Sequence, residues 1–187
     1  SSAADAISVN ASFGSVIDGG DTRTDISATN GGAILSGQFG ITAIESDVSS
    51  LNALSAAGDI SLTEASGLTL SRISALDSSS LTAGGAILTT NSTVFGGNDL
   101  NLITSSYIQV PQLGISMPDL VLLNAADVRA ESGLRNLSLA GQHVSVDTAS
   151  TGGNLQINSA TNLLTLRNTG SNIITLNDTD ALMLASV

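Results

Sequence analysis

Aspartate side chains are the residues of this sequence best suited to chemistry. Asp18, Asp21 and Asp25 lie in one glycine-rich stretch, and Asp178 and Asp180 lie in a second stretch, Asn-Asp-Thr-Asp. Paired carboxylates hydrolyse glycosidic bonds, and clustered carboxylates bind calcium. These acids therefore have two interpretations: a carbohydrate-active or glycan-binding site, or solvated corners that keep the protein soluble.

Three further aspartates, Asp59, Asp77 and Asp99, are spaced so that stacked coils would bring them together along one face. Two of them belong to a recurring phrase in which glycine and Asn or Asp precede an aliphatic residue. Because glycine accepts a positive φ and Asn or Asp caps a turn through its own backbone, turn formation explains this repetition better than a ligand does. The phrase occurs at Gly58-Asp59-Ile60, Gly97-Asn98-Asp99-Leu100 and Gly153-Asn154-Leu155.

Other catalytic signatures are missing from the sequence. His143 is the single histidine, and its position at the start of His-Val-Ser-Val-Asp is typical of a strand-edge residue. There is no cysteine, no Gly-x-Ser-x-Gly motif and no phosphate-binding glycine loop. Gly96 to Leu100 matches only half of a calcium-binding nonapeptide, and nothing repeats at nine residues. We therefore predict no catalytic, cofactor-binding or metal-ligating residues, and we do not expect an enzyme.

The composition excludes several kinds of partner. Sixteen acids against five arginines give a net charge of −11, which disfavours nucleic acid and anionic membranes. Aromatic residues are only 2% of the chain, namely Phe13, Phe39, Phe95 and Tyr107. Sugar-binding clefts usually present aromatic and basic side chains, so this scarcity weighs against the carbohydrate interpretation. It also means that Ile, Leu, Val and Ala must form the core.

Residues 154–187 show most clearly which elements would position these side chains. Four short segments alternate apolar and polar residues and are separated by turn formers, which predicts strands with one buried face. The first and third segments are related by about 19 residues, and a repeat near 20 with two strands and two turns is typical of a β-solenoid. The apolar pairs are Leu155/Ile157, Leu164/Leu166, Ile174/Leu176 and Leu182/Leu184.

The same rhythm extends back through the chain and predicts two stacked columns of core residues. We expect one elongated domain over residues 1–187, of roughly 20 residues per coil and about nine coils, excerpted from a much longer chain. The first predicted column is Ile60, Leu81, Leu100, Leu120, Leu137, Leu155 and Ile174. The second is Leu68, Ile87, Tyr107, Val128, Val144, Leu163 and Leu182.

Some segments and the fold itself leave alternatives open. Residues 50–58 suit either strands or a helical turn, and residues 124–133 suit either a strand and turn or a short helix. Pro111 and Pro118 bracket a segment that we expect to protrude as a loop, because proline is excluded from central strands. A β-sandwich also has short strands at this spacing, but hairpin dipeptides are rare here.

Two stretches, residues 58–92 and 152–178, resemble the repeat region of filamentous-haemagglutinin-like exoproteins. The resemblance covers most of residues 25–187 and lies in composition and in the degenerate rhythm Gly-Asp/Asn-aliphatic-x-Leu. These exoproteins are large bacterial adhesins, often exported by two-partner secretion. The resemblance implies a right-handed parallel β-helix in the shaft of a secreted or cell-surface rod, and autotransporter passenger domains are similar. It supplies no site residues.

Two functions follow as expectations. The first is a structural and adhesive segment of a secreted or cell-surface bacterial protein, which acts in cell adhesion or as a spacer. Its partners would be a receptor or glycan on a host or neighbouring cell, or another copy stacked end to end. The alternative is a carbohydrate-active or glycan-binding module that uses the surface aspartates. No cofactor, nucleic acid or membrane insertion is expected.

Overall fold

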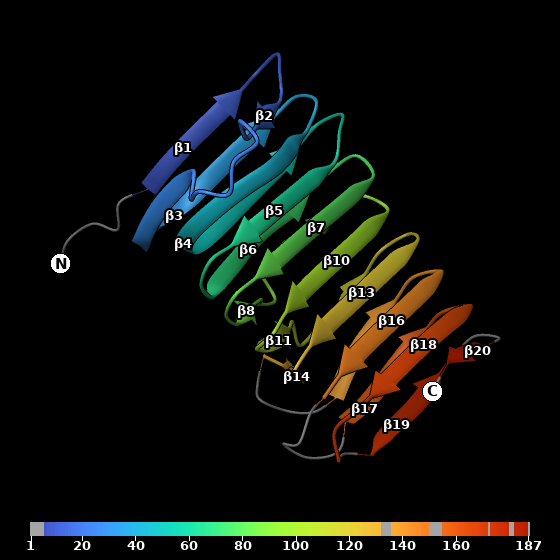
Figure 1. Ribbon diagram of the computed structural model, residues 1–187. Helices are drawn as coiled ribbons and strands as arrows, with labels where there is room; N and C mark the ends of the chain where they lie inside the picture. Colours follow the sequence, from blue (N-terminus) through green and yellow to red (C-terminus); the bar gives the residue numbers. More distant parts are fainter. Residues whose placement is uncertain (1–5, 132–135, 150–154, 172, 180–181, 187) are drawn as a thin grey trace.

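The computed structural model is an all-β, parallel β-solenoid of about seven turns with about 20 residues per turn. It describes residues 6–131, 136–149, 155–171, 173–179 and 182–186. Figure 1 shows the strands stacked side by side from the N-terminal to the C-terminal end. No helix long and apolar enough to cross a membrane occurs among these residues.

The described residues form twenty strands in the stack. They are β1 (Ala6–Ala11), β2 (Val16–Ile17), β3 (Ile26–Gly37), β4 (Ile41–Ser55), β5 (Ile60–Glu64), β6 (Leu68–Ser74), β7 (Ser78–Ala83), β8 (Ile87–Leu88), β9 (Val94–Gly96), β10 (Asp99–Thr104), β11 (Tyr107–Val110), β12 (Ile115–Ser116), β13 (Leu120–Ala125), β14 (Asp127–Ala130), β15 (Asn136–Ala140), β16 (His143–Thr148), β17 (Leu155–Ala160), β18 (Leu163–Asn168), β19 (Ile174–Asp178) and β20 (Met183–Ser186).

The longest ladder contributes one strand from each successive coil. It runs from the first part of β4 through β5, β7, β10, β13, β16 and β18 to β20, and each pairing is parallel. Along β5 the burial alternates strictly, with Ile60, Leu62 and Glu64 inside and Ser61 and Thr63 outside. This alternation is the reason the segment forms a strand, because a slip of one residue would expose the whole apolar set.

Aliphatic side chains stack coil upon coil in the interior. Leu62 pairs with Leu81, Leu81 with Leu102, and the column continues through Leu123 and Val146. All five side chains are almost completely buried. Each contributes about 1.5–3 kcal/mol of hydrophobic stabilisation. No aromatic ring belongs to this column, as the low aromatic content led us to expect.

The rest of each coil forms two shorter ladders. One joins β1, β3, β4 and β6, and then β8, β11 and β14. The other is a separate four-stranded sheet in the order β12, β15, β17 and β19. Every pairing in the described part of the chain is parallel, which excludes the β-sandwich alternative and its antiparallel hairpins.

Several predictions about individual segments are confirmed. Leu155 pairs with Ile174 and Ile157 with Leu176, as expected for adjacent coils. Of the two segments left open between strand and helix, residues 50–55 belong to strand β4 and Asp127–Ala130 form strand β14. The prediction of about nine coils is wrong. The structure has about seven turns of about 20 residues, so the predicted count was slightly too high.

The predicted columns are only partly right. The step from Leu68 to Ile87 is confirmed, but Ile87 then pairs with Ile108 and not with Tyr107, whose side chain lies outside the core. Leu100 pairs with Val121 rather than Leu120. The first column also moves from the long ladder to the four-stranded sheet at Leu137, and the second moves between ladders at Val144.

The prediction of a protruding loop over residues 111–118 is only partly right, because residues 112–113 form an exposed turn but the following residues do not. Ile115 and Ser116 form β12, which pairs with β15. Ile115 and Met117 are buried in the core. The segment therefore closes the coil with a two-residue strand, which is too short for an alternating pattern to reveal.

Candidate functional site

Three carboxylates meet near the N-terminal end of the solenoid, at Asp18, Asp25 and Glu45. Asp18 follows β2, and its backbone N–H donates to the carbonyl of Thr42 over 3.2 Å. Asp25 immediately precedes β3, and its N–H donates to the carbonyl of Glu45 over 2.8 Å. Asp18 and Asp25 lie at the two ends of one turn, in a coil that pairs with β4, and Glu45 lies in β4 itself, so the stacking of two coils completes the cluster.

A β-bulge in strand β4 precedes Glu45. Ile41 pairs with Ile60 and Ile44 with Leu62, so β4 has one more residue than β5 in this interval. Ala43 lies in the bulge with a φ of 56°. Bulges redirect the side chains that follow them. Here Ile44 remains in the core while Glu45 points outward toward the two aspartates.

The geometry of the cluster is close. One carboxylate oxygen from each residue lies within 4.8 Å of the others. The N–H of Glu45 donates to Asp25 Oδ2 over 3.1 Å, whereas Glu45 Oε2 has no hydrogen-bond partner. Partial burial and the charges of Asp18 and Asp25 raise the pKa of Glu45. The cluster thus combines a carboxyl group that holds its proton more tightly with two neighbouring carboxylates.

This arrangement can support two kinds of chemistry. A pair of carboxyl groups about 5 Å apart, one with a raised pKa, is the arrangement of retaining glycosidases. Three oxygens so close together could also provide part of the ligand set of a hard cation. Asp21, which we had grouped with Asp18 and Asp25, is not part of this cluster; its Oδ1 accepts from the N–H of Arg23 over 2.7 Å in a local turn.

Glu45 was missed in the sequence analysis. Its signal was its position 20 residues after Asp25, one coil further along the chain. Neighbours one coil apart were considered for Asp59, Asp77 and Asp99 but not for Asp25.

A second group of acids lies along the corner that precedes the long ladder. Asp77 Oδ1 accepts from Asn98 Nδ2 over 2.7 Å, and Asp59 Oδ1 accepts from the N–H of Ser78 over 3.0 Å. Partial burial, together with the charges of Asp119, Asp77 and Asp59, raises the pKa of Asp99. The predicted alignment of Asp59, Asp77 and Asp99 along one face is thus present, and Asp119 extends it. The primary role of each of these aspartates is that of a turn residue that links neighbouring coils.

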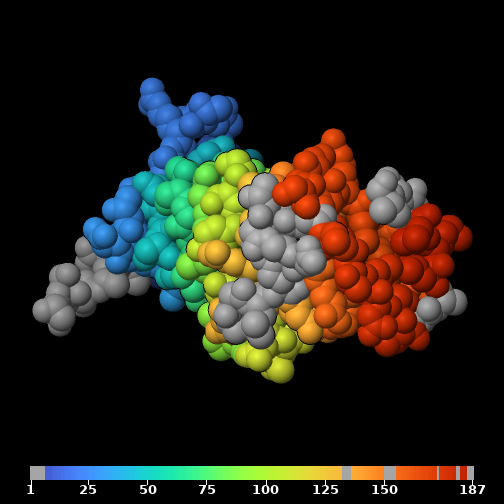
Figure 2. All heavy atoms as spheres, turned by 90° about the horizontal axis from the view of Figure 1, so that it is seen from below, coloured from blue at the N-terminus to red at the C-terminus, as the bar shows by residue number. Residues whose placement is uncertain are grey.

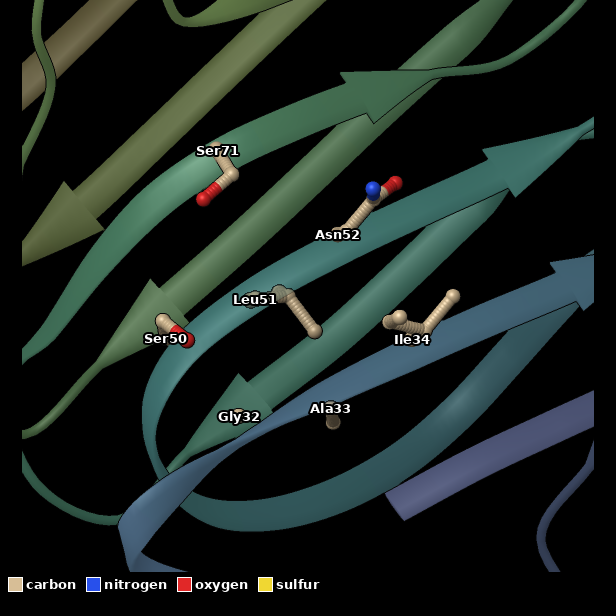
Figure 3. Close-up of a pocket in the computed structure, with 7 residues that line it drawn as sticks. All are labelled: Gly32, Ala33, Ile34, Ser50, Leu51, Asn52 and Ser71. Atoms are coloured by element: carbon tan, nitrogen blue, oxygen red, sulfur yellow. The ribbon is translucent and has the colours of Figure 1, made fainter. Parts of the chain in front are cut away.

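A shallow groove lies on the outer side of strands β3, β4 and β6. Its volume is about 320 Å³. Figure 3 shows Ile34 and Asn52 on adjacent strands, with Gly32 and Ser50 along the same two strands and Ser71 on the next. Gly32 makes the groove possible, because a Cβ there would lie 2.4 Å from Ser50 Oγ. Hydroxyl and amide groups beside one exposed isoleucine offer weak, neutral binding.

The remaining predicted residues are dispersed. His143 begins β16, as expected of a strand-edge residue, and its Nε2 lies 3.1 Å from Thr165 Oγ1. Asp178 accepts a hydrogen bond from Ser159 in the next strand. Asp180 lies outside the described residues, as does the phrase at Gly153-Asn154. Comparison of the chain with protein-family models, curated proteins and solved structures found no match.

Proposed function

We propose that this chain is a structural and adhesive β-solenoid segment of a large secreted or cell-surface bacterial protein. The observation that carries the proposal is the continuous column from Leu62 to Val146, which makes an elongated body from repeated coils. Such a stack holds its corners and faces at fixed spacing, and it can separate or present binding surfaces along its length. The resemblance to haemagglutinin-like repeats supports the same role.

Bead attachment tests this proposal. Beads coated with the folded chain should attach to cultured epithelial or bacterial cells in greater numbers than beads coated at equal density with albumin. Beads coated with the heat-unfolded chain provide the matched control. Equal attachment by all three would contradict an adhesive role.

Self-association would extend the rod. Among the described residues, β19 and β20 each lie at the end of a sheet, and Met183 and Leu184 are more than half exposed on β20. Unpaired strand edges template pairing with another chain. Light scattering that increases with protein concentration is the expected result, and a monomer at all concentrations would contradict stacking.

A glycan-active or glycan-binding module is the second candidate, favoured by carboxylate oxygens of Asp18, Asp25 and Glu45 that lie within 4.8 Å of one another. Glycan arrays and reducing-sugar assays test it. The variants Asp25→Asn and Glu45→Gln should abolish any signal, whereas Asp21→Asn, in the same stretch but outside the cluster, should retain it. Equal signals from all three variants would refute this candidate.

A further inference from the structure

Two of the three phenylalanines in this chain lie in solvent rather than in the core. Phe13 is 94% exposed and Phe39 is 59% exposed, and Leu76 is 62% exposed. Phe95, by contrast, packs against the core. This protein has few aromatic residues, and it exposes its largest apolar side chains close together. Such a cluster indicates an interaction surface, because the core would otherwise bury these side chains.

These three side chains belong to turns that stack on one another at one corner. The N–H of Phe39 donates to the carbonyl of Gly14 over 3.2 Å, which places the turn of Phe13 beside it. A Cβ on Gly58 would lie 2.1 Å from the carbonyl oxygen of Phe39, and the N–H of Leu76 donates to the carbonyl of Gly58. We call the stacked turns at residues 13–14, 39–40, 58–59, 76–77 and 98–99 the aromatic corner.

The corner can be followed in both overall views. The turns that lead into β5, β7 and β10 line the upper right edge of the stack in Figure 1. In Figure 2 the dark-blue residues near the N-terminus protrude from the body. The exposed fractions of Phe13, Phe39 and Leu76 show that the corner is accessible at these three turns.

The charge of the corner defines the chemistry of what it can bind. Asp77 directly follows the exposed Leu76, and Asp59 and Asp99 lie in the neighbouring turns of the corner, where partial burial and the charges of Asp119, Asp77 and Asp59 raise the pKa of Asp99. Among the described residues, the arginines lie elsewhere, in the turn at Arg23 and in strands β6, β14 and β18. The corner thus combines exposed apolar side chains with negative charges that no arginine in these turns balances.

We propose that the aromatic corner binds an extended, cationic protein segment that carries aliphatic side chains between its basic ones. Aromatic side chains are the usual anchors of such interfaces, and opposite charges steer the encounter and fix the register. Turns repeat about every 4.8 Å, so an extended segment running along the stack could contact several turns. The inference rests on the proposed adhesive function only in assuming that the chain presents binding surfaces. Its test does not involve cell attachment, so the two proposals can fail separately.

Fluorine NMR on the intact chain tests the proposal directly. Protein labelled with 4-fluorophenylalanine should give one resonance for each of its three phenylalanines. The probe is a 12-residue peptide of three Lys-Leu-Lys-Gly repeats. We expect it to shift the resonances of Phe13 and Phe39 and to leave Phe95 unchanged. Peptides in which Glu replaces Lys, or Gly replaces Leu, should shift none of them.

Substitutions then separate the corner from general surface charge. Fluorescence anisotropy with the Lys-Leu-Lys-Gly peptide should show binding at least about tenfold weaker in Phe13→Ser/Phe39→Ser, as loss of aromatic anchors typically costs. Asp77→Asn should weaken binding of the peptide and should make its affinity depend less on salt concentration. Leu113→Ser, which removes an equally exposed apolar side chain from a different turn, should bind like the unmodified chain.

Three results would overturn the proposal. The first is unchanged affinity in Phe13→Ser/Phe39→Ser. The second is equal loss in Leu113→Ser, which would indicate diffuse attraction to an acidic protein. The third is a calcium-induced shift at the corner without any peptide-induced shift, which would assign the aspartates to a cation instead. All variants alter exposed side chains, and circular dichroism verifies that each retains its β structure.

Discussion

Replacing Glu64 should destabilise the solenoid more than replacing any exposed acid. Glu64 is 1% exposed at the end of β5, where the paired residues are Ser46 in the preceding coil and Ala83 in the following coil. Its Oε2 accepts from Ser46 Oγ over 2.6 Å, and its Oε1 accepts from the N–H of Val48 over 3.1 Å. Oε1 also accepts from both the N–H and the Oγ of Ser66. The carboxylate thus accepts hydrogen bonds from inside the solenoid and stabilises the corner of the preceding coil.

The magnitude follows from the groups that Glu64→Ala leaves unpaired. In Glu64→Ala the buried N–H of Val48 loses its acceptor, which costs about 1–3 kcal/mol. The hydroxyl of Ser46 can still donate to the carbonyl of Thr63, and Ser66 is exposed to water, so each loses less. Adding about 1 kcal/mol for these weaker losses, we expect unfolding to become easier by about 2–4 kcal/mol.

Urea unfolding followed by circular dichroism measures this change. Glu64→Gln keeps an acceptor for Val48 and should cost about 1 kcal/mol, the difference between a charge-assisted and a neutral hydrogen bond. Ser61→Ala, on the outer side of the same strand, should change stability by less than about 0.5 kcal/mol. Equal stability of Glu64→Ala and Ser61→Ala would refute the argument.

Two other predictions concern a turn and the carboxylate cluster. Gly58→Ala should lower the midpoint of urea unfolding, because its Cβ would lie 2.1 Å from the Phe39 carbonyl oxygen. Gly14→Ala is the control and should leave the midpoint unchanged, because its Cβ would have nothing within 4 Å. Equal midpoints in the two variants would contradict the contact. Carbon-detected NMR should show Glu45 titrating with a pKa above the ordinary value of a glutamate side chain. Since the folded state binds this proton more tightly, the contribution of Glu45 to stability falls as pH rises from the ordinary pKa through the raised one. Asp18→Asn should lower the pKa of Glu45, and an unchanged titration would show that Asp18 does not act on it.

The repeat and the strands could be predicted from the sequence because inward and outward residues alternate. Where alternation fails, the prediction fails with it. Leu120 to Leu123 are four consecutive leucines and valines, so the pattern does not reveal which pair faces inward, and Val121 rather than Leu120 is the core residue. Tyr107 was assigned to the second column because it follows Ile87 by 20 residues, yet it lies outside the core, with Arg129 3.5 Å above its ring centre.

The carboxylate sites required knowledge of the register. Asp18, Asp25 and Glu45 meet only because β2, β3 and β4 stack with a bulge before Glu45, and no local pattern encodes that bulge. The alignment of Asp59, Asp77 and Asp99 was easier to predict, because each occupies the same turn of its coil. Stacking in a solenoid thus makes residues one coil apart the relevant neighbours.

Distances between spin labels test the solenoid most directly. The chain has no cysteine, so paired labels can be introduced cleanly on the outer column Ser61, Ser80, Asn101, Leu122, Ser145 and Thr165, whose members pair in successive coils. With Ser61→Cys as the fixed position, we predict separations that grow by about 4.8 Å per coil, to about 19 Å at Ser145 and about 24 Å at Thr165. Separations that do not increase in this order would contradict a parallel stack of coils.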